Sequence, residues 1–90
     1  MKLLVIEDEL SLQEMMAVTL RKDGFIVETA SDFRTAVDKL AGYSYDCILL
    51  DITLPDGNGL DILRMIKDSG TCVNVIITSA RDSIVPVSSH

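Results

Sequence analysis

The sequence predicts an α/β fold in which a doubly wound parallel sheet carries helices on both faces. Short aliphatic or β-branched runs alternate along the chain with stretches whose apolar residues recur at helical spacing. A glycine closes each of the three helical stretches, and a strand-like run follows each time. Strands that alternate with helices in this way pair in parallel through right-handed crossovers.

The first half of the chain supplies two strands and two helices. Lys2–Ile6 is an aliphatic run closed by acids, which is typical of a strand buried on both faces. Phe25–Thr29 is β-branched and aromatic, and is therefore a second strand. Between these runs the apolar residues recur every three or four positions and predict a helix. The second helix has Ser31 or Asp32 as its N-cap and ends at Gly42.

The second half supplies two more strands and one helix. Tyr45–Leu50 is the third strand, and it closes on Asp51. Residues 55–59 combine proline, aspartate, asparagine and glycine, which is the composition of a turn. Apolar residues beyond this turn predict a helix that stops at Gly70, and Val73–Thr78 is the fourth strand.

Composition excludes several function classes. Eight basic against fourteen acidic residues give the 90-residue chain a net charge of −6, which argues against a surface that binds nucleic acid. Its apolar runs fall far short of the ~20 residues that a membrane-spanning helix needs. No secretory signal and neither glycine-rich nucleotide-binding motif is present, so we expect a cytoplasmic protein. Cys47 and Cys72 form no metal-binding pattern, and we expect both to be reduced rather than joined in a disulfide.

Acidic residues follow two of the predicted strands. Glu7 and Asp8 come directly after the first strand, and Asp51 comes after the third. If these strands are neighbours, ~4.8 Å apart, the three carboxylates share one small volume. Their mutual repulsion raises the pKa of at least one of them unless a cation neutralises it. Mg²⁺ prefers such oxygen ligands and leaves room for a phosphate.

Asp51 is the strongest candidate for chemistry. A carboxylate held at the end of a rigid strand can attack a phosphorus atom in line and become an acyl phosphate. Ser79, at the end of the fourth strand, offers a hydroxyl to a phosphoryl oxygen. Each feature alone has a simpler explanation, since acids favour a solvated helix N-terminus and serine is a common helix cap. Only their location after successive strands of one sheet supports the joint interpretation.

Three segments of the sequence resemble the receiver domain of bacterial two-component response regulators. They are residues 4–9, residues 48–59 and residues 76–82. The middle segment is the most specific, because it joins a strand and its aspartate to a Leu-Pro pair and an Asp-Gly-Asn-Gly turn. The sequence of these segments is most similar to the branch of the family that carries a winged-helix DNA-binding output domain. The resemblance runs from Met1 to about Ser83.

This resemblance implies a role for each candidate residue. Asp51 is the phosphoacceptor, and Ser79 is the switch hydroxyl with Thr78 as the alternative. The implied Mg²⁺ site consists of Glu7, Asp8, Asp51 and the backbone carbonyl of Thr53, with Asp8 a direct ligand and Glu7 acting mainly through water. The implied phosphodonor is a phosphohistidine on a sensor histidine kinase. The domain is thus a signalling module rather than an enzyme.

The chain departs from the family near its end. The family fold has strand order 2-1-3-4-5, but here Lys67 is the last lysine and no residue matches the lysine of the fifth strand. We therefore expect a C-terminally truncated receiver domain over residues 1–83, with strand order 2-1-3-4 and an irregular tail over residues 84–90. The fourth strand would then be an open edge, and we expect it to drive self-association.

Two other functions fit parts of the sequence. The fragment could act only as an interaction module that pairs with other chains and never accepts phosphate. It could also be a Mg²⁺-dependent phosphohydrolase, whose nucleophile loop resembles residues 51–53. Thr53 stands where that class has a second aspartate, and ninety residues leave little chain for a substrate pocket.

Overall fold

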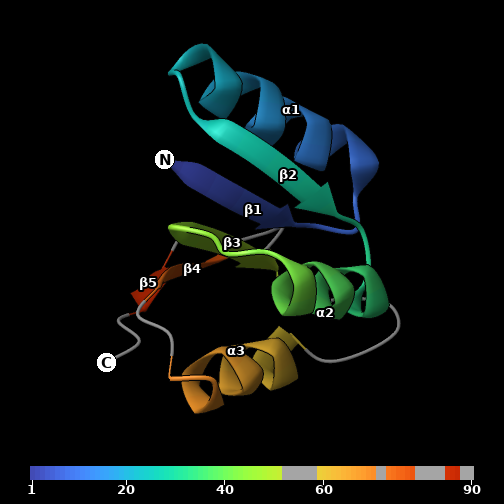
Figure 1. Ribbon diagram of the computed structural model, residues 1–90. Helices are drawn as coiled ribbons and strands as arrows, with labels where there is room; N and C mark the ends of the chain where they lie inside the picture. Colours follow the sequence, from blue (N-terminus) through green and yellow to red (C-terminus); the bar gives the residue numbers. More distant parts are fainter. Residues whose placement is uncertain (52–58, 71–72, 79–84, 88–90) are drawn as a thin grey trace.

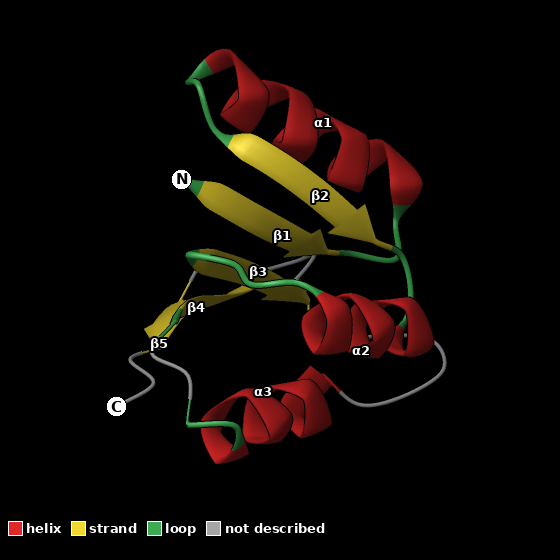
Figure 2. Ribbon diagram, in the orientation of Figure 1, coloured by secondary structure: helices red, strands yellow, loops and turns green. Residues whose placement is uncertain are grey.

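The computed structural model describes residues 1–51, 59–70, 73–78 and 85–87. Within these residues a five-stranded sheet lies between helices on its two faces (Figures 1 and 2). The elements in chain order are β1 (Lys2–Ile6), α1 (Leu10–Lys22), β2 (Ile26–Ala30), α2 (Phe33–Gly42), β3 (Cys47–Asp51), α3 (Gly59–Asp68), β4 (Asn74–Thr78) and β5 (Val85–Val87).

The sheet has the order β2-β1-β3-β4-β5, and its first four strands are parallel. The predicted α/β class and the order 2-1-3-4 are therefore confirmed. Ile6 at the end of β1 is in register with Ala30 on one side and Leu50 on the other. Because the strand ends are level, the residues that follow β1 and the last residue of β3 meet at one edge of the sheet.

The core is split into two layers by the sheet. In Figure 1, α1 lies over one face, and α2 and α3 lie over the other. Side chains alternate along β1 and β3, so that both faces of these strands are apolar. The buried residues of β1 and β3 on the α2 and α3 side are Leu4, Ile6, Ile48 and Leu50, and those on the α1 side are Leu3, Val5 and Cys47. Such double burial makes the two central strands rigid supports for whatever follows them.

Two acidic side chains cap the helices next to the sheet edge. Glu9 is the N-cap of α1, and its carboxylate accepts hydrogen bonds from the amides of Ser11 and Leu12 at 3.1 and 3.0 Å. Asp32 is the N-cap of α2 and accepts from the amide of Thr35 at 2.7 Å, which resolves the choice between Ser31 and Asp32. Both caps fix the angle at which a helix leaves the carboxyl edge of the sheet.

The end of the chain differs from the prediction. Val85–Val87, which lies in the predicted irregular tail, forms the short strand β5 and pairs antiparallel with β4. The expectation of an open β4 edge is wrong for Val75–Ile77, which are in register with this strand. A three-residue run with a central proline has no strand signal of its own, and the pairing partner alone defines it. Self-association remains a prediction.

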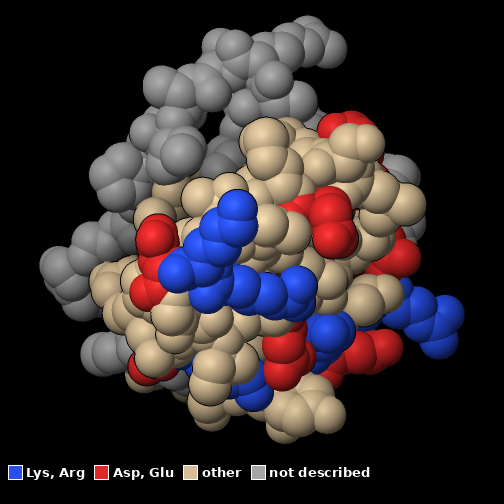
Figure 3. Space-filling view, turned by 90° about the horizontal axis from the view of Figure 1, so that it is seen from above, with Lys and Arg blue, Asp and Glu red and all other residues tan. Residues whose placement is uncertain are grey.

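The surface over α1 carries charges of both signs. Figure 3, viewed from above Figure 1, shows Lys and Arg interspersed with Asp and Glu and with uncharged side chains. No helix among the described residues is long and apolar enough to cross a membrane.

Two glycines at helix ends should respond to alanine in opposite directions. Gly24 follows α1 with a φ of 94°, a conformation that alanine adopts only under strain, so Gly24→Ala should cost ~1 kcal/mol of unfolding free energy. Gly42 ends α2 without a positive φ, and Gly42→Ala should stabilise by ~0.5 kcal/mol. Added Cβ atoms meet nothing within 4 Å at either position. Urea unfolding followed by circular dichroism measures both, and a neutral Gly24→Ala would contradict the backbone argument.

Candidate metal centre

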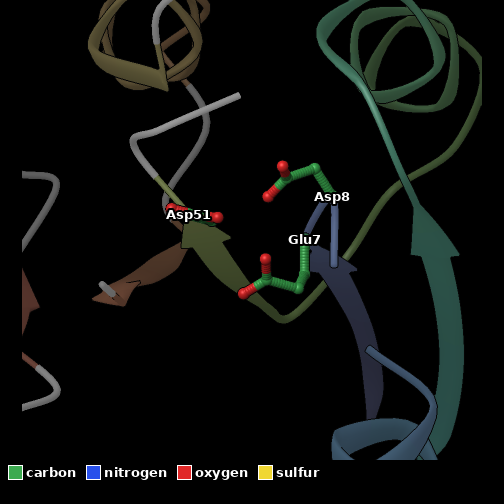
Figure 4. A group of neighbouring side chains, drawn as sticks. All are labelled: Glu7, Asp8 and Asp51. Carbon is green, nitrogen blue, oxygen red and sulfur yellow. The ribbon is translucent and has the colours of Figure 1, made fainter. Parts of the chain in front are cut away.

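Three carboxylates meet at the carboxyl edge of the sheet. Glu7 and Asp8 follow β1, and Asp51 is the last residue of β3. One oxygen from each of the three lies within 4.8 Å of the others, and Figure 4 shows all three side chains directed into the space between the two strand ends. Glu7 and Asp51 are each only 1% exposed, whereas Asp8 is exposed. The cluster is thus a buried pair of acids with an acid at its entrance.

The backbone of Glu7 is held by its neighbours. Its amide donates a hydrogen bond to the carbonyl of Ala30 at 2.9 Å, and its carbonyl accepts one from Nε2 of Gln13 at 3.0 Å. On the side chain, Oε2 accepts from the amide of Glu9 at 3.2 Å. The other oxygen, Oε1, is buried and has no hydrogen-bond partner among the described residues. A buried carboxylate oxygen without a donor is costly unless a proton or a cation satisfies it.

Electrostatics at the cluster are unfavourable for three separate anions. Burial, and after it the neighbouring carboxylates of Asp51 and Asp8, raise the pKa of Glu7 from 4.5 to about 7, although the hydrogen bond from the Glu9 amide acts in the opposite direction. Near neutral pH the site therefore holds either an added proton or an uncompensated charge. A strongly shifted acid in a specific cluster is typical of a functional site.

The donor set fits a hard divalent cation. All the available atoms are carboxylate oxygens, which are ligands that Mg²⁺ prefers, and no sulfur or imidazole accompanies them in the described cluster. A cation bound in the cluster, either directly or through a water molecule, would compensate the unsatisfied Oε1 of Glu7. Asp8 is exposed, so the cluster is in contact with solvent on that side.

Some predicted site residues are not described. Thr53 and Ser79 both lie outside the described residues, so their predicted roles stay predictions. Thr78, the alternative to Ser79, ends β4 and is in register with Asp51. The backbone of Thr78 therefore lies beside that of Asp51.

Sequence reasoning missed two residues that shape the site. Glu9 caps α1, and its amide donates a hydrogen bond to the Glu7 carboxylate. Gln13 is a buried polar residue of α1 whose Nε2 donates a hydrogen bond to the Glu7 carbonyl. The sequence carried one signal for Gln13, namely a glutamine one position after apolar Leu12 on the helical stripe. That spacing places it at the edge of the face that packs on the sheet.

Cys47 lies in the sheet and is not one of the acidic cluster. Cys47 is a free, buried thiol in β3, and burial raises its pKa, which makes its thiolate scarce. This agrees with a reduced structural cysteine, and Cys72 lies outside the described residues.

Comparison with known families decides the class of the chain. The family model of the response regulator receiver domain matches residues 3–88. The chain belongs to this family. The match covers the three acidic residues of the cluster and extends over β5.

Several proteins with similar sequences bear the names of bacterial transcriptional regulators. The alkaline phosphatase synthesis transcriptional regulatory protein SphR of Synechococcus elongatus is 35% identical over 91% of this receiver chain and 35% of its own length. The transcriptional regulatory protein TrcR of Mycobacterium tuberculosis is 34% identical over 93% of this chain and 33% of its own. The chain thus spans about a third of the length of the curated relatives it matches.

Solved receiver structures share the fold. The response regulator TrrA of Thermotoga maritima, solved in complex with Mg²⁺ and BeF, has a TM-score of 0.82 and 28% identity over 88% of this chain and 69% of that one. The non-phosphorylated HemR receiver domain of Leptospira biflexa has a TM-score of 0.83 and 29% identity over 91% of this chain and 66% of that one.

Stability should fall as the pH rises through the titration of Glu7. Its pKa in the folded state, about 7, lies above the 4.5 of the free side chain, so the folded protein binds the extra proton between these values. The unfolding free energy should therefore be higher at pH 5 than at pH 8. Glu28 and Asp32 have lowered pKa values, so their titration affects the unfolding free energy only at more acidic pH.

Urea unfolding at several pH values checks this dependence. In Glu7→Gln the decline between pH 5 and pH 8 should disappear, because the titrating group is gone. Mg²⁺ should restore stability to the wild type more at pH 8 than at pH 5. A wild type that is equally stable at both pH values would contradict the shifted pKa.

Proposed function

We propose that this chain is the phosphoacceptor domain of a two-component response regulator, which receives a phosphoryl group from a sensor histidine kinase on Asp51. The observation that carries the proposal is the meeting of Asp51 with Glu7 and Asp8 within 4.8 Å at the carboxyl edge of a receiver fold. The location follows the rule that open parallel sheets bind ligands beyond their strand ends.

Asp51 is suited to act as the nucleophile. It ends β3, which lies between β1 and β4, and it is in register with Thr78 of β4, so the carboxylate has a fixed position at the strand end. In the transfer, an oxygen of Asp51 forms a new bond to phosphorus while the bond from phosphorus to the histidine nitrogen breaks. The electron pair returns to the imidazole, and the product is an acyl phosphate. Rigid placement supplies the in-line geometry that this step requires.

Glu7, Asp8 and Asp51 are the described residues that would hold Mg²⁺. When bound, the ion neutralises charge on the phosphoryl oxygens beside these acids. Glu7 contributes its otherwise unsatisfied Oε1, and Asp8 offers an exposed carboxylate at the entrance. The TrrA structure, which contains Mg²⁺ and BeF, supports the assignment by likeness of fold. We assign the carbonyl of Thr53 to the ion and the hydroxyl of Ser79 to a phosphoryl oxygen, as the family resemblance implies.

The larger role is regulation of transcription. Relatives such as SphR and TrcR bear the names of transcriptional regulators and are about three times longer than this chain. In the proposal, phosphorylation occurs in the cytoplasm and changes the conformation of the domain, and an output domain of a longer protein reads the change. The domain itself is a signalling module and acts on no substrate other than its own Asp51.

Labelling with a small phosphodonor should be specific for Asp51. Acetyl phosphate with Mg²⁺ should add the mass of one phosphoryl group to the wild-type chain and none to Asp51→Asn, as read by intact mass spectrometry. Asp38→Asn, which removes an exposed carboxylate of α2, is the matched control and should label like the wild type. Labelling of Asp51→Asn at the wild-type level would reject the phosphoacceptor.

The metal should be required for the same reaction. Removal of Mg²⁺ with a chelator should abolish labelling, and Asp8→Asn should slow it by ~10-fold or more, because a carboxylate ligand is lost. Labelling that proceeds unchanged without Mg²⁺ would reject the metal centre. Self-association that ignores Mg²⁺, phosphodonor and Asp51→Asn, in a chain that never labels, would favour the interaction module instead.

A further inference from the structure

Gln13 is a buried polar side chain next to the acidic cluster. It lies in the first half of α1 and is only 8% exposed. Its Nε2 is within 3.0 Å of the Glu7 carbonyl, 3.2 Å of the Ala30 carbonyl and 3.1 Å of Oγ of Ser31. The carboxamide therefore joins three segments: the connection after β1, the end of β2, and the start of the connection to α2.

The orientation of this carboxamide follows from its partners. Carbonyl oxygens accept hydrogen bonds and cannot donate, so the NH₂ group and not the oxygen must face Glu7 and Ala30. The NH₂ group has two N–H bonds for three acceptors, so at least one N–H is shared.

These contacts fix the backbone from which the Glu7 side chain extends. The Glu7 amide donates to the Ala30 carbonyl, and Gln13 then links the Glu7 carbonyl to that same Ala30 carbonyl. Glu7 is thus held on both sides of its Cα atom. This restraint matters because the carboxylates of Asp51 and Asp8 repel an ionised Glu7 and push the connection after β1 away from β3.

We propose that Gln13 is a positioning residue for the metal centre, holding Glu7 and Asp8 at the distance from Asp51 that a divalent cation needs. The inference rests on the proposed Mg²⁺ site and adds a residue that does not touch the ion. Residues that orient metal ligands through hydrogen bonds commonly change metal affinity by ~10 to 100-fold when removed.

The test is the Mg²⁺ affinity of Gln13→Met in the whole 90-residue chain. Methionine keeps the length and apolar stem of glutamine and lacks the N–H donors. Titration of ¹⁵N-labelled protein with MgCl₂ should show ~10-fold weaker binding than in the wild type. Without Mg²⁺, the Glu7 amide should exchange its hydrogen faster, because the carbonyl on the other side of its residue is no longer held.

A control variant separates positioning from general stability. Tyr45→Phe removes the partly buried hydrogen bond from Tyr45 Oη to Glu28 Oε1, 2.9 Å long, just before the amino end of β3 and away from the acidic cluster. It should lower the unfolding free energy by an amount similar to that of Gln13→Met and leave Mg²⁺ affinity unchanged. Gln13→Asn, which keeps the amide on a shorter stem, should also weaken Mg²⁺ binding and serves if the methionine variant does not fold.

The outcomes distinguish this inference from the proposed function. Wild-type Mg²⁺ affinity in the Gln13 variants, or an equal loss in Tyr45→Phe, would overturn the role of Gln13 and leave the metal centre intact. A wild type that binds no Mg²⁺ at any concentration tested would overturn both. Weaker binding confined to the Gln13 variants, with faster exchange at Glu7, supports the positioning role.

Discussion

The confinement of Glu7 and Asp51 in one buried space is the constraint on which the rest of this structure depends. Two carboxylates that are each 1% exposed oppose folding, because burial and mutual repulsion both penalise the ionised forms. They stay together because they extend from adjacent central strands that are packed on both faces. The apolar sheet thus supplies the rigidity, and the acids at its edge carry an electrostatic strain that a proton or a cation relieves.

Glu28 and Glu7 lie in opposite electrostatic environments at the two ends of the sheet. Toward the amino end, Glu28 is paired with Lys2 at 3.2 Å and Lys39 at 3.4 Å, and it accepts a hydrogen bond from Tyr45. These partners lower its pKa, Tyr45 most strongly. At the carboxyl edge, burial and other acids raise the pKa of Glu7 instead. The charge of Glu28 is compensated by its partners, which stabilises the fold. The charge of Glu7 has no such partner among the described residues, and this is typical of a ligand-binding site.

The resting structure around Glu7 also explains how a site of like charges keeps its geometry. The amide of Glu9 and the carboxamide of Gln13 both donate to Glu7, one to its side chain and one to its backbone. Glu9 in turn caps α1, so the acidic connection is part of the helix start rather than a free loop. Hydrogen bonds between neutral donors and this segment oppose the repulsion without cancelling the negative charge that a cation needs.

The sequence by itself determined the alternation of strands and helices, because apolar spacing and glycine stops are local signals. It also placed Glu7, Asp8 and Asp51 at strand ends, whereas the strand order that makes β1 and β3 neighbours was implied by the family resemblance. Tertiary structure alone decided the rest. Val85–Val87 is a strand only because β4 lies beside it, and Gln13 matters only because Glu7, Ala30 and Ser31 converge on its amide. Such contacts join residues from different elements of the fold, and the local periodicity of the sequence does not predict them.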